Sequence, residues 1–186
     1  VMKILGSILI GVAILIFVTT LVLVFTSPGY FGSRYLRKLM ETEFRKRSKP
    51  LVSTADADTR FVQVIPRANW AKLKLIDATD VGFLRVDKQR GELLFEGDKE
   101  CYRIPAAAIT SCEIETFIQG QGSHGATTLY RVVLQANHPS GFWEAPFAQC
   151  GNSGKYRRKS REKWALALQG EIRELMFTAK NQATPV

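Results

Sequence analysis

The sequence is poor in the side chains that build metal centres and acid–base sites. It has only two histidines, His124 and His138, and neither has a second ligand at metal-site spacing. Its three cysteines, Cys101, Cys112 and Cys150, include no C-x-x-C pair. An odd number without such a pair indicates neither a disulfide framework nor a zinc site, and it favours a reducing compartment.

Nucleotide-binding and nucleophile motifs are also missing. The glycine-rich segment 120–125 lacks the G-x-x-x-x-G-K-[ST] pattern of a phosphate loop, and no helical pattern follows it. Cys150 lies among small polar residues, and no neighbouring feature would activate its thiol. We therefore expect no enzyme, no cofactor and no metal.

One long apolar run dominates the N-terminal part. From Ile4 to Thr26 there are 23 residues without a charge, Pro, Asn or Gln. At ~1.5 Å per residue, a helix of this length covers roughly 35 Å, enough to cross the ~30 Å hydrocarbon core of a bilayer. The run is longer than the core of a signal peptide, and residues 26–31 offer no convincing cleavage site. We expect an uncleaved transmembrane anchor over residues 1–27, although the chain starts at Val1, which leaves room for an earlier membrane segment.

The charges on either side of this run predict its orientation. Only Lys3 precedes it, whereas residues 34–50 carry seven basic and two acidic side chains, a net charge of +5. Basic residues next to a membrane segment tend to stay on the cytoplasmic side. We therefore expect a single-pass protein of the inner or plasma membrane, with its C-terminal domain in the cytoplasm.

Residues 28–59 form the predicted juxtamembrane region. Pro28 and Gly29 should end the membrane helix. Over residues 34–47, apolar residues recur at helical spacing, which predicts a basic amphipathic helix followed by a short linker over residues 49–58. Such a helix lies in the lipid headgroup region or serves as a solvated connector. Its candidate lipid-facing cations are Arg34, Arg37, Lys38, Arg45, Lys46 and Arg47.

Beyond residue 60 the apolar pattern changes to a period of two, which predicts short strands. The expected strands are 61–65, 73–76, 82–87, 101–104, 109–117, 129–136 and 142–147. The segment 85–93 predicts a hairpin with Leu84, Val86, Leu93 and Phe95 pointing inward. Pro146 predicts an edge or bulged position for the last strand, because proline cannot donate to a ladder.

A helix should follow the strands. Trp164, Leu168, Ile172 and Leu175 form one apolar stripe at helical spacing. The fold class is therefore mainly β, a small barrel or sandwich with a C-terminal capping helix, plus one N-terminal transmembrane helix. We expect the soluble domain over residues 60–178 and a flexible tail over residues 179–186.

Residues 82–86, 91–97 and 102–113, together with the closing helix, resemble the pleckstrin-homology-like superfold in its bacterial and GRAM-related variants. The passage Arg103-Ile104-Pro105 followed by small residues, Ile109 and Ser111 carries much of this likeness. The resemblance implies a binding module. In that superfold a basic hairpin between the first two strands often contacts phosphoinositides or other anionic headgroups.

The resemblance assigns this role to Arg85, Lys88 and Arg90. Asp87 and Glu92 lie among these cations, so an ordinary charged turn is the alternative.

A second basic cluster precedes the C-terminal helix. It consists of Lys155, Arg157, Arg158, Lys159, Arg161 and Lys163. Each cation near an anionic leaflet contributes ~1 kcal/mol of attraction. No basic and aromatic platform is evident, so nucleic acid is not expected as a partner. A solvated helix start is the alternative interpretation.

Together these features predict a membrane-tethered, non-catalytic binding module that docks on a protein partner or on anionic inner-leaflet lipid. The alternative is a structural subunit of a larger membrane assembly, in which the anchor helix packs through Ser7 and Gly11.

Overall fold

The computed structural model describes residues 28–70, 78–119, 127–138, 141–150 and 158–182. The predicted membrane span at residues 1–27 and the expected strand at 73–76 lie outside these residues. Among the helices of the described segments, none is long and apolar enough to cross a membrane. The helices and strands are α2 (Pro28–Arg45), β1 (Arg60–Val64), η1 (Arg67–Asn69), β2 (Asp80–Asp87), β3 (Glu92–Gly97), β4 (Cys101–Pro105), η2 (Ala106–Ala108), β5 (Ile109–Gln119), β6 (Thr127–His138), β7 (Gly141–Gln149) and α3 (Arg158–Gln182).

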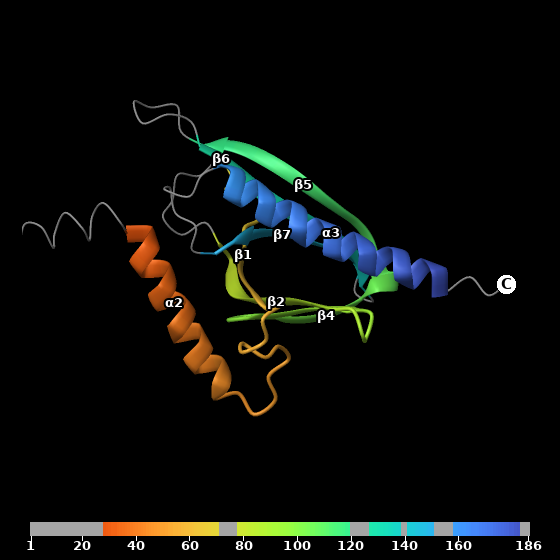
Figure 1. Cartoon of the computed structure of the whole chain (residues 1–186), viewed down its shortest axis with the longest axis horizontal. Coiled ribbons are helices and arrows are strands. Elements are labelled where there is room, and N and C mark those ends of the chain that lie inside the picture. The colour runs from red at the N-terminus through yellow and green to blue at the C-terminus, as the bar shows by residue number, and fades with distance from the viewer. Residues whose placement is uncertain (1–27, 71–77, 120–126, 139–140, 151–157, 183–186) are drawn as a thin grey trace, which may run out of the picture.

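The seven strands form one antiparallel sheet in the order β4-β3-β2-β1-β7-β6-β5. The sheet bends, so that β2 and β4 lie opposite β5 and β6 in Figure 1, and α3 runs along the opening between the two halves. Buried side chains from all seven strands and from α3 form one core. The mainly β fold with a C-terminal helix is thus confirmed.

The predicted inward faces are also confirmed. Leu84, Val86, Leu93 and Phe95 of the β2–β3 hairpin are all buried in the core. On β6, the alternate residues Tyr130, Val132, Leu134 and Ala136 are buried in the same core. On α3, Leu168, Ile172 and Leu175 are buried, and Trp164 packs against them. The helix continues to Gln182, beyond the predicted start of the tail at residue 179.

Turn chemistry explains the two hairpins that shape the first half of the sheet. In the β2–β3 turn, Gly91 has a φ of 67°, a conformation that glycine adopts without steric cost. In the β3–β4 turn, the carboxylate of Asp80 accepts hydrogen bonds from the backbone N–H groups of Asp98 and Glu100. Gly97 lies against that carboxylate, and a Cβ there would be 2.1 Å from Asp80 Oδ2. These contacts fix the position of β4.

Helix α2 packs on the outer face of the sheet. Met40 and Phe44 join Phe61, Phe83 and Leu94 in a second apolar cluster, and the rings of Phe44 and Phe83 meet edge to face at 5.3 Å. The described helix includes Pro28 and so extends further toward the N-terminus than the predicted start at residue 34. The expectation that Pro28 and Gly29 end the membrane helix depends on residues 1–27, which lie outside the described residues.

The predicted linker is part of this packing and is not a loose connector. Val52 is buried, and its N–H donates a 2.8 Å hydrogen bond to Glu96 Oε2 of β3. The apolar side of α2 therefore faces the sheet and not lipid or water, which neither of the two interpretations anticipated.

The position of β7 corrects the expectation that Pro146 marks an edge or bulged strand. The strand pairs with β1 on one side and β6 on the other, so it is central and not an edge strand. Its proline is tolerated because the nitrogen of Pro146 faces the point where the β1 ladder ends: Ile65 N–H donates to Pro146 O at 3.1 Å, and Pro66 follows.

Candidate functional site

The second basic cluster lies at the start of α3. Lys155 and Arg157 lie outside the described residues, and Arg158 is the first residue of the helix. Lys159 and Lys163 are exposed and, being four residues apart, share one helix face. Arg161 is half-buried, and its Nη1 donates a 3.3 Å hydrogen bond to the carbonyl oxygen of Thr128 on β6.

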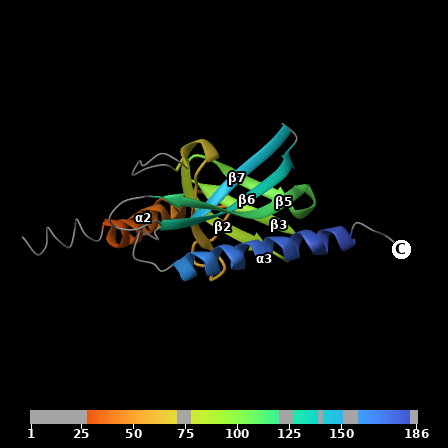
Figure 2. The same ribbon diagram turned by 90° about the horizontal axis from the view of Figure 1, so that it is seen from above.

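Three segments that are distant in sequence lie toward the same end of the molecule as this cluster. Figures 1 and 2 show the start of α2, the end of β5 with the start of β6, and the start of α3 at that end. Ile118, which pairs with Thr128 at the hairpin tip, is 63% exposed. Leu36 of α2 and Cys150, just after β7, both pack against the second apolar cluster. We call this the proximal end, because Pro28 directly follows the predicted span.

The cations of α2 divide into two groups. Arg37 pairs with Glu41 at 2.8 Å and Lys46 with Glu43 at 2.7 Å, both on the helix surface. Lys38 and Arg45 are exposed, and Arg34 lies in the first part of the helix.

Arg47 is different, because its side chain points into the protein. Its guanidinium lies 3.9 Å from the centre of the Phe44 ring and donates to Glu96 Oε1 and to the carbonyl oxygen of Gly97, each at 3.1 Å. Glu96 is 1% exposed, so Arg47 neutralises a buried carboxylate. The prediction that Arg47 faces lipid is wrong: it holds the end of α2 on the sheet.

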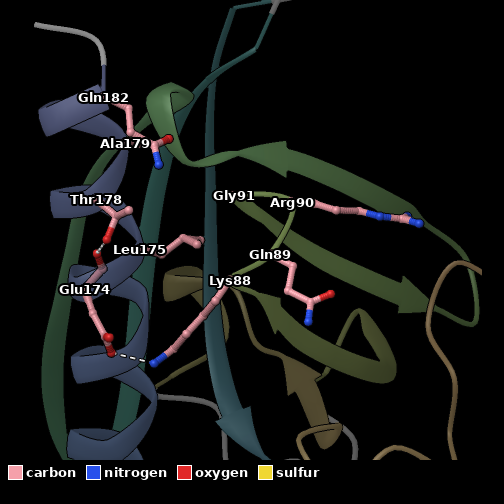
Figure 3. Close-up of a pocket in the computed structure, with 9 residues that line it drawn as sticks. All are labelled: Lys88, Gln89, Arg90, Gly91, Glu174, Leu175, Thr178, Ala179 and Gln182. Carbon is pink, nitrogen blue, oxygen red and sulfur yellow. Dashed lines mark hydrogen bonds and ion pairs between the residues drawn. The ribbon is translucent and has the colours of Figure 1, made fainter.

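The hairpin cations do not gather into one site. Arg85 Nη1 pairs with Asp56 at 2.5 Å, and Lys88 Nζ pairs with Glu174 of α3 at 2.6 Å. Figure 3 shows Lys88 reaching across to Glu174 over a small pocket, whereas Arg90 points away from α3. This pocket has a volume of about 250 Å³. Of the three predicted lipid contacts, Arg85 and Lys88 already bind carboxylates of the protein.

The hairpin itself also differs in position from the family pattern. Lys88 and Arg90 lie between β2 and β3, whereas the resemblance places the basic hairpin between the first two strands. The connection from β1 to β2 instead spans residues 65–79, which the structure describes only in part. The hairpin therefore does not match the family pattern in strand position, and lipid contact by Arg85, Lys88 and Arg90 stays a prediction.

A polar network that the sequence did not predict crosses the outer face of β5 and β7. Arg67 binds the carboxylates of Glu115 and Glu144, and Gln135 Nε2 donates to Glu144 Oε2 at 2.9 Å. The hydrogen bonds that Arg67 donates to Glu115 and then to Glu144 raise the pKa of Arg67, and the bond from Arg67 lowers the pKa of Glu144. Glu115 and Glu144 are 48 and 77 residues from Arg67 in the sequence, so no local sequence pattern could predict these ion pairs.

The thiols are placed in different environments. Burial raises the pKa of Cys112 and of Cys150 to about 12, whereas Cys101 is exposed on β4. In the described part of the chain, no three His, Cys, Asp or Glu residues lie together in a way that could hold a metal ion.

Comparison of the chain with protein-family models, with curated proteins and with solved structures found no match.

Proposed function

We propose that this chain is a membrane-tethered binding module with a pleckstrin-homology-like fold, whose proximal end contacts an anionic leaflet. The fold supports the resemblance, because seven antiparallel strands close around one core and a C-terminal helix covers the opening. Residues 82–97 and 102–113, which carry the likeness in sequence, form β2, β3, β4 and β5 of this sheet.

The observation that carries the proposal is that α2 and α3 both start at the proximal end. Residue 28 directly follows the predicted span, so the start of α2 is the part of the domain nearest to the bilayer. The start of α3, with the exposed amino groups of Lys159 and Lys163, lies at that same end (Figure 1). Cations held this close to an anionic leaflet contribute ~1 kcal/mol each.

The outward side of α2 fits the same arrangement. Tyr35 and Leu39 are 70% and 45% exposed, and their spacing of four residues puts them on one face of the helix. Lys38 is exposed beside them. An aromatic ring, an aliphatic side chain and a lysine are the composition that favours the interface between lipid headgroups and acyl chains.

The β2–β3 hairpin is unsuited to this contact. Glu174, the partner of Lys88, is 16 residues along α3 from the start of the helix at Arg158. At ~1.5 Å per residue this is roughly 24 Å along the helix axis, beyond the ~8 Å Debye length at physiological salt. Lys88 and the cations at the start of α3 therefore cannot act on the same headgroups.

The test uses the full chain reconstituted in nanodiscs of neutral lipid or of lipid that contains phosphatidylserine. Acetylation of lysine amines is followed residue by residue by mass spectrometry, at low and high salt. Lys159 and Lys163 should react severalfold more slowly in anionic discs at low salt, and high salt should remove the difference. Lys99, an exposed residue of the β3–β4 turn, is the internal control.

Two results would contradict the proposal in different ways. Equal acetylation of Lys159 in neutral and anionic discs would rule out contact with the leaflet through the proximal end. Release of the chain from membranes by alkaline carbonate would rule out the tether.

A further inference from the structure

Strand β4 forms one edge of the sheet, and the hydrogen-bond pattern shows which of its backbone groups face outward. At one end of the β3–β4 pairing, Gly97 N–H donates to Glu100 O at 2.7 Å, and at the other, Ala106 N–H donates to Gly91 O at 2.8 Å. In an antiparallel pair, hydrogen-bonded and non-bonded residue pairs alternate. When this alternation is followed inward from both ends of the pairing, Tyr102 and Ile104 are the residues that bond to β3.

The alternate residues of β4 form no hydrogen bonds with β3. Cys101, Arg103 and Pro105 occupy the non-bonded pairs, so their carbonyl groups, and the N–H groups of Cys101 and Arg103, point away from β3. Within the segments that the structure describes, no hydrogen bond to these outward groups is found. The edge is thus an open row of alternating donors and acceptors.

An apolar cavity of about 510 Å³ lies beside this row. The residues that line it come from the whole length of β4, from η2 and from the neighbouring ends of β6 and β7. They include Tyr102, Ile104, Ala108, Ala136 and Trp143. The rings of Tyr102 and Trp143 lie 4.9 Å apart. The cavity is large enough for an aliphatic or aromatic side chain.

We propose that β4 binds an extended segment of a partner protein as an additional strand, and that one apolar side chain of this segment fills the cavity. Only an extended chain matches a row of alternating N–H and C=O groups. In such a chain alternate side chains point to one side, so a residue bonded to Arg103 is flanked by residues that face the cavity.

The charge at the edge indicates what else the segment contains. Arg103 has a side chain that is 52% exposed, and its nearest carboxylate, Glu92, lies 3.6 Å away, beyond hydrogen-bond distance. An acidic residue of the peptide would complete this pairing. The occupant is therefore an extended segment with alternating apolar and acidic residues. This inference is independent of the proposed lipid contact at the proximal end.

Hydrogen exchange on the full chain in nanodiscs tests the free edge. The amides of Tyr102 and Ile104 should exchange slowly, and those of Cys101 and Arg103 much faster. Slow exchange at Arg103 without any added peptide would overturn the proposal, because the edge would already be covered.

Selection from a display library of random decapeptides tests the occupant. We expect enrichment of peptides with alternating apolar and acidic residues, and addition of an enriched peptide should slow exchange at Arg103 but leave Lys159 acetylation unchanged. Arg103→Pro removes both the outward N–H and the guanidinium, and should weaken peptide binding at least tenfold, or ~1.4 kcal/mol. Arg103→Gln retains the N–H and should weaken binding severalfold less.

Ala108→Leu, which narrows the cavity and retains the edge, should also weaken peptide binding. It provides a second measurement if Arg103→Pro does not fold. A library with no enriched peptides, or equal binding by the parent chain, Arg103→Pro and Ala108→Leu, would overturn the proposal. So would a dimer of the parent chain that Arg103→Pro converts to a monomer, because a second copy would then occupy the edge.

Discussion

The indole Nε1 of Trp70 donates a 2.8 Å hydrogen bond to the carbonyl oxygen of Ile65. Ile65 lies opposite Pro146, since its own N–H donates to the carbonyl oxygen of Pro146. In a regular pair of this kind, residue 146 would return a hydrogen bond to Ile65, but proline has no N–H. Trp70 therefore supplies the donor that the central strand β7 lacks.

Replacing Trp70 by Phe should destabilise the fold by about 1 kcal/mol, because a buried acceptor loses its donor. Pro146→Ala restores a backbone donor, so the same Trp70→Phe change should cost clearly less in that background. Urea unfolding of the four variants measures this double-mutant cycle. Equal costs in both backgrounds would show that the indole does not substitute for the missing N–H.

Arg47→Gln should lower the free energy of unfolding by about 2 kcal/mol. This is below the range for fully buried pairs, because Arg47 is still 31% exposed. The change leaves Glu96 buried with the Val52 N–H as its remaining donor. Lys46→Gln, which breaks an exposed pair with Glu43, is the matched control and should change stability by less than ~0.5 kcal/mol. Denaturant unfolding compares the two variants, and equal effects would contradict the conclusion that Arg47 holds the end of α2 on the sheet.

Acid should weaken the fold through Glu144. Hydrogen bonds from Arg67 lower its pKa from the ordinary value of 4.5, so the unfolded chain takes up this proton at a higher pH than the folded chain. The contribution of Glu144 is complete above pH 4.5 and is lost as pH falls through the lowered value. Glu144→Gln should flatten stability against pH in this window. In an Arg67→Gln background, Glu144→Gln should no longer change the profile.

Two of the thiols, Cys101 and Cys112, should differ in their reactivity in the native protein. At pH 8, iodoacetamide should alkylate exposed Cys101 in the native protein, whereas Cys112 should react only after denaturant is added, since burial raises its pKa to about 12. An unfolded thiol ionises near 9, so Cys112 also lowers stability as the pH rises above 9. Mass spectrometry of labelled peptides checks this, and equal rates at both cysteines would contradict the buried position.

Local patterns in the sequence were sufficient to predict the β2–β3 hairpin and the buried face of α3. In both elements the repeat of apolar residues follows directly from the geometry of one strand pair or one helix. Leu93, Leu94 and Phe95 also form an unbroken apolar run, which is typical of a strand covered on both faces. That run is the signal that could have predicted α2 against Phe83 and Leu94.

The candidate site was less predictable, because its charges are balanced over long distances. Lys88 and Glu174 are 86 residues apart, and Arg85 and Asp56 are 29 apart. A basic hairpin and a neutralised hairpin have the same local sequence. The proximal end could not be predicted from local sequence either, since only the folded chain brings the starts of α2 and α3 to the same end of the molecule.

The docking of α2 has a mechanical consequence. A domain at the end of a long flexible chain can take many orientations relative to the point where the chain is attached. Here Phe44 and Arg47 hold α2 against the sheet, so the helix and the strands have a fixed relative orientation. The orientation of α2 therefore determines the direction in which the strands and α3 face.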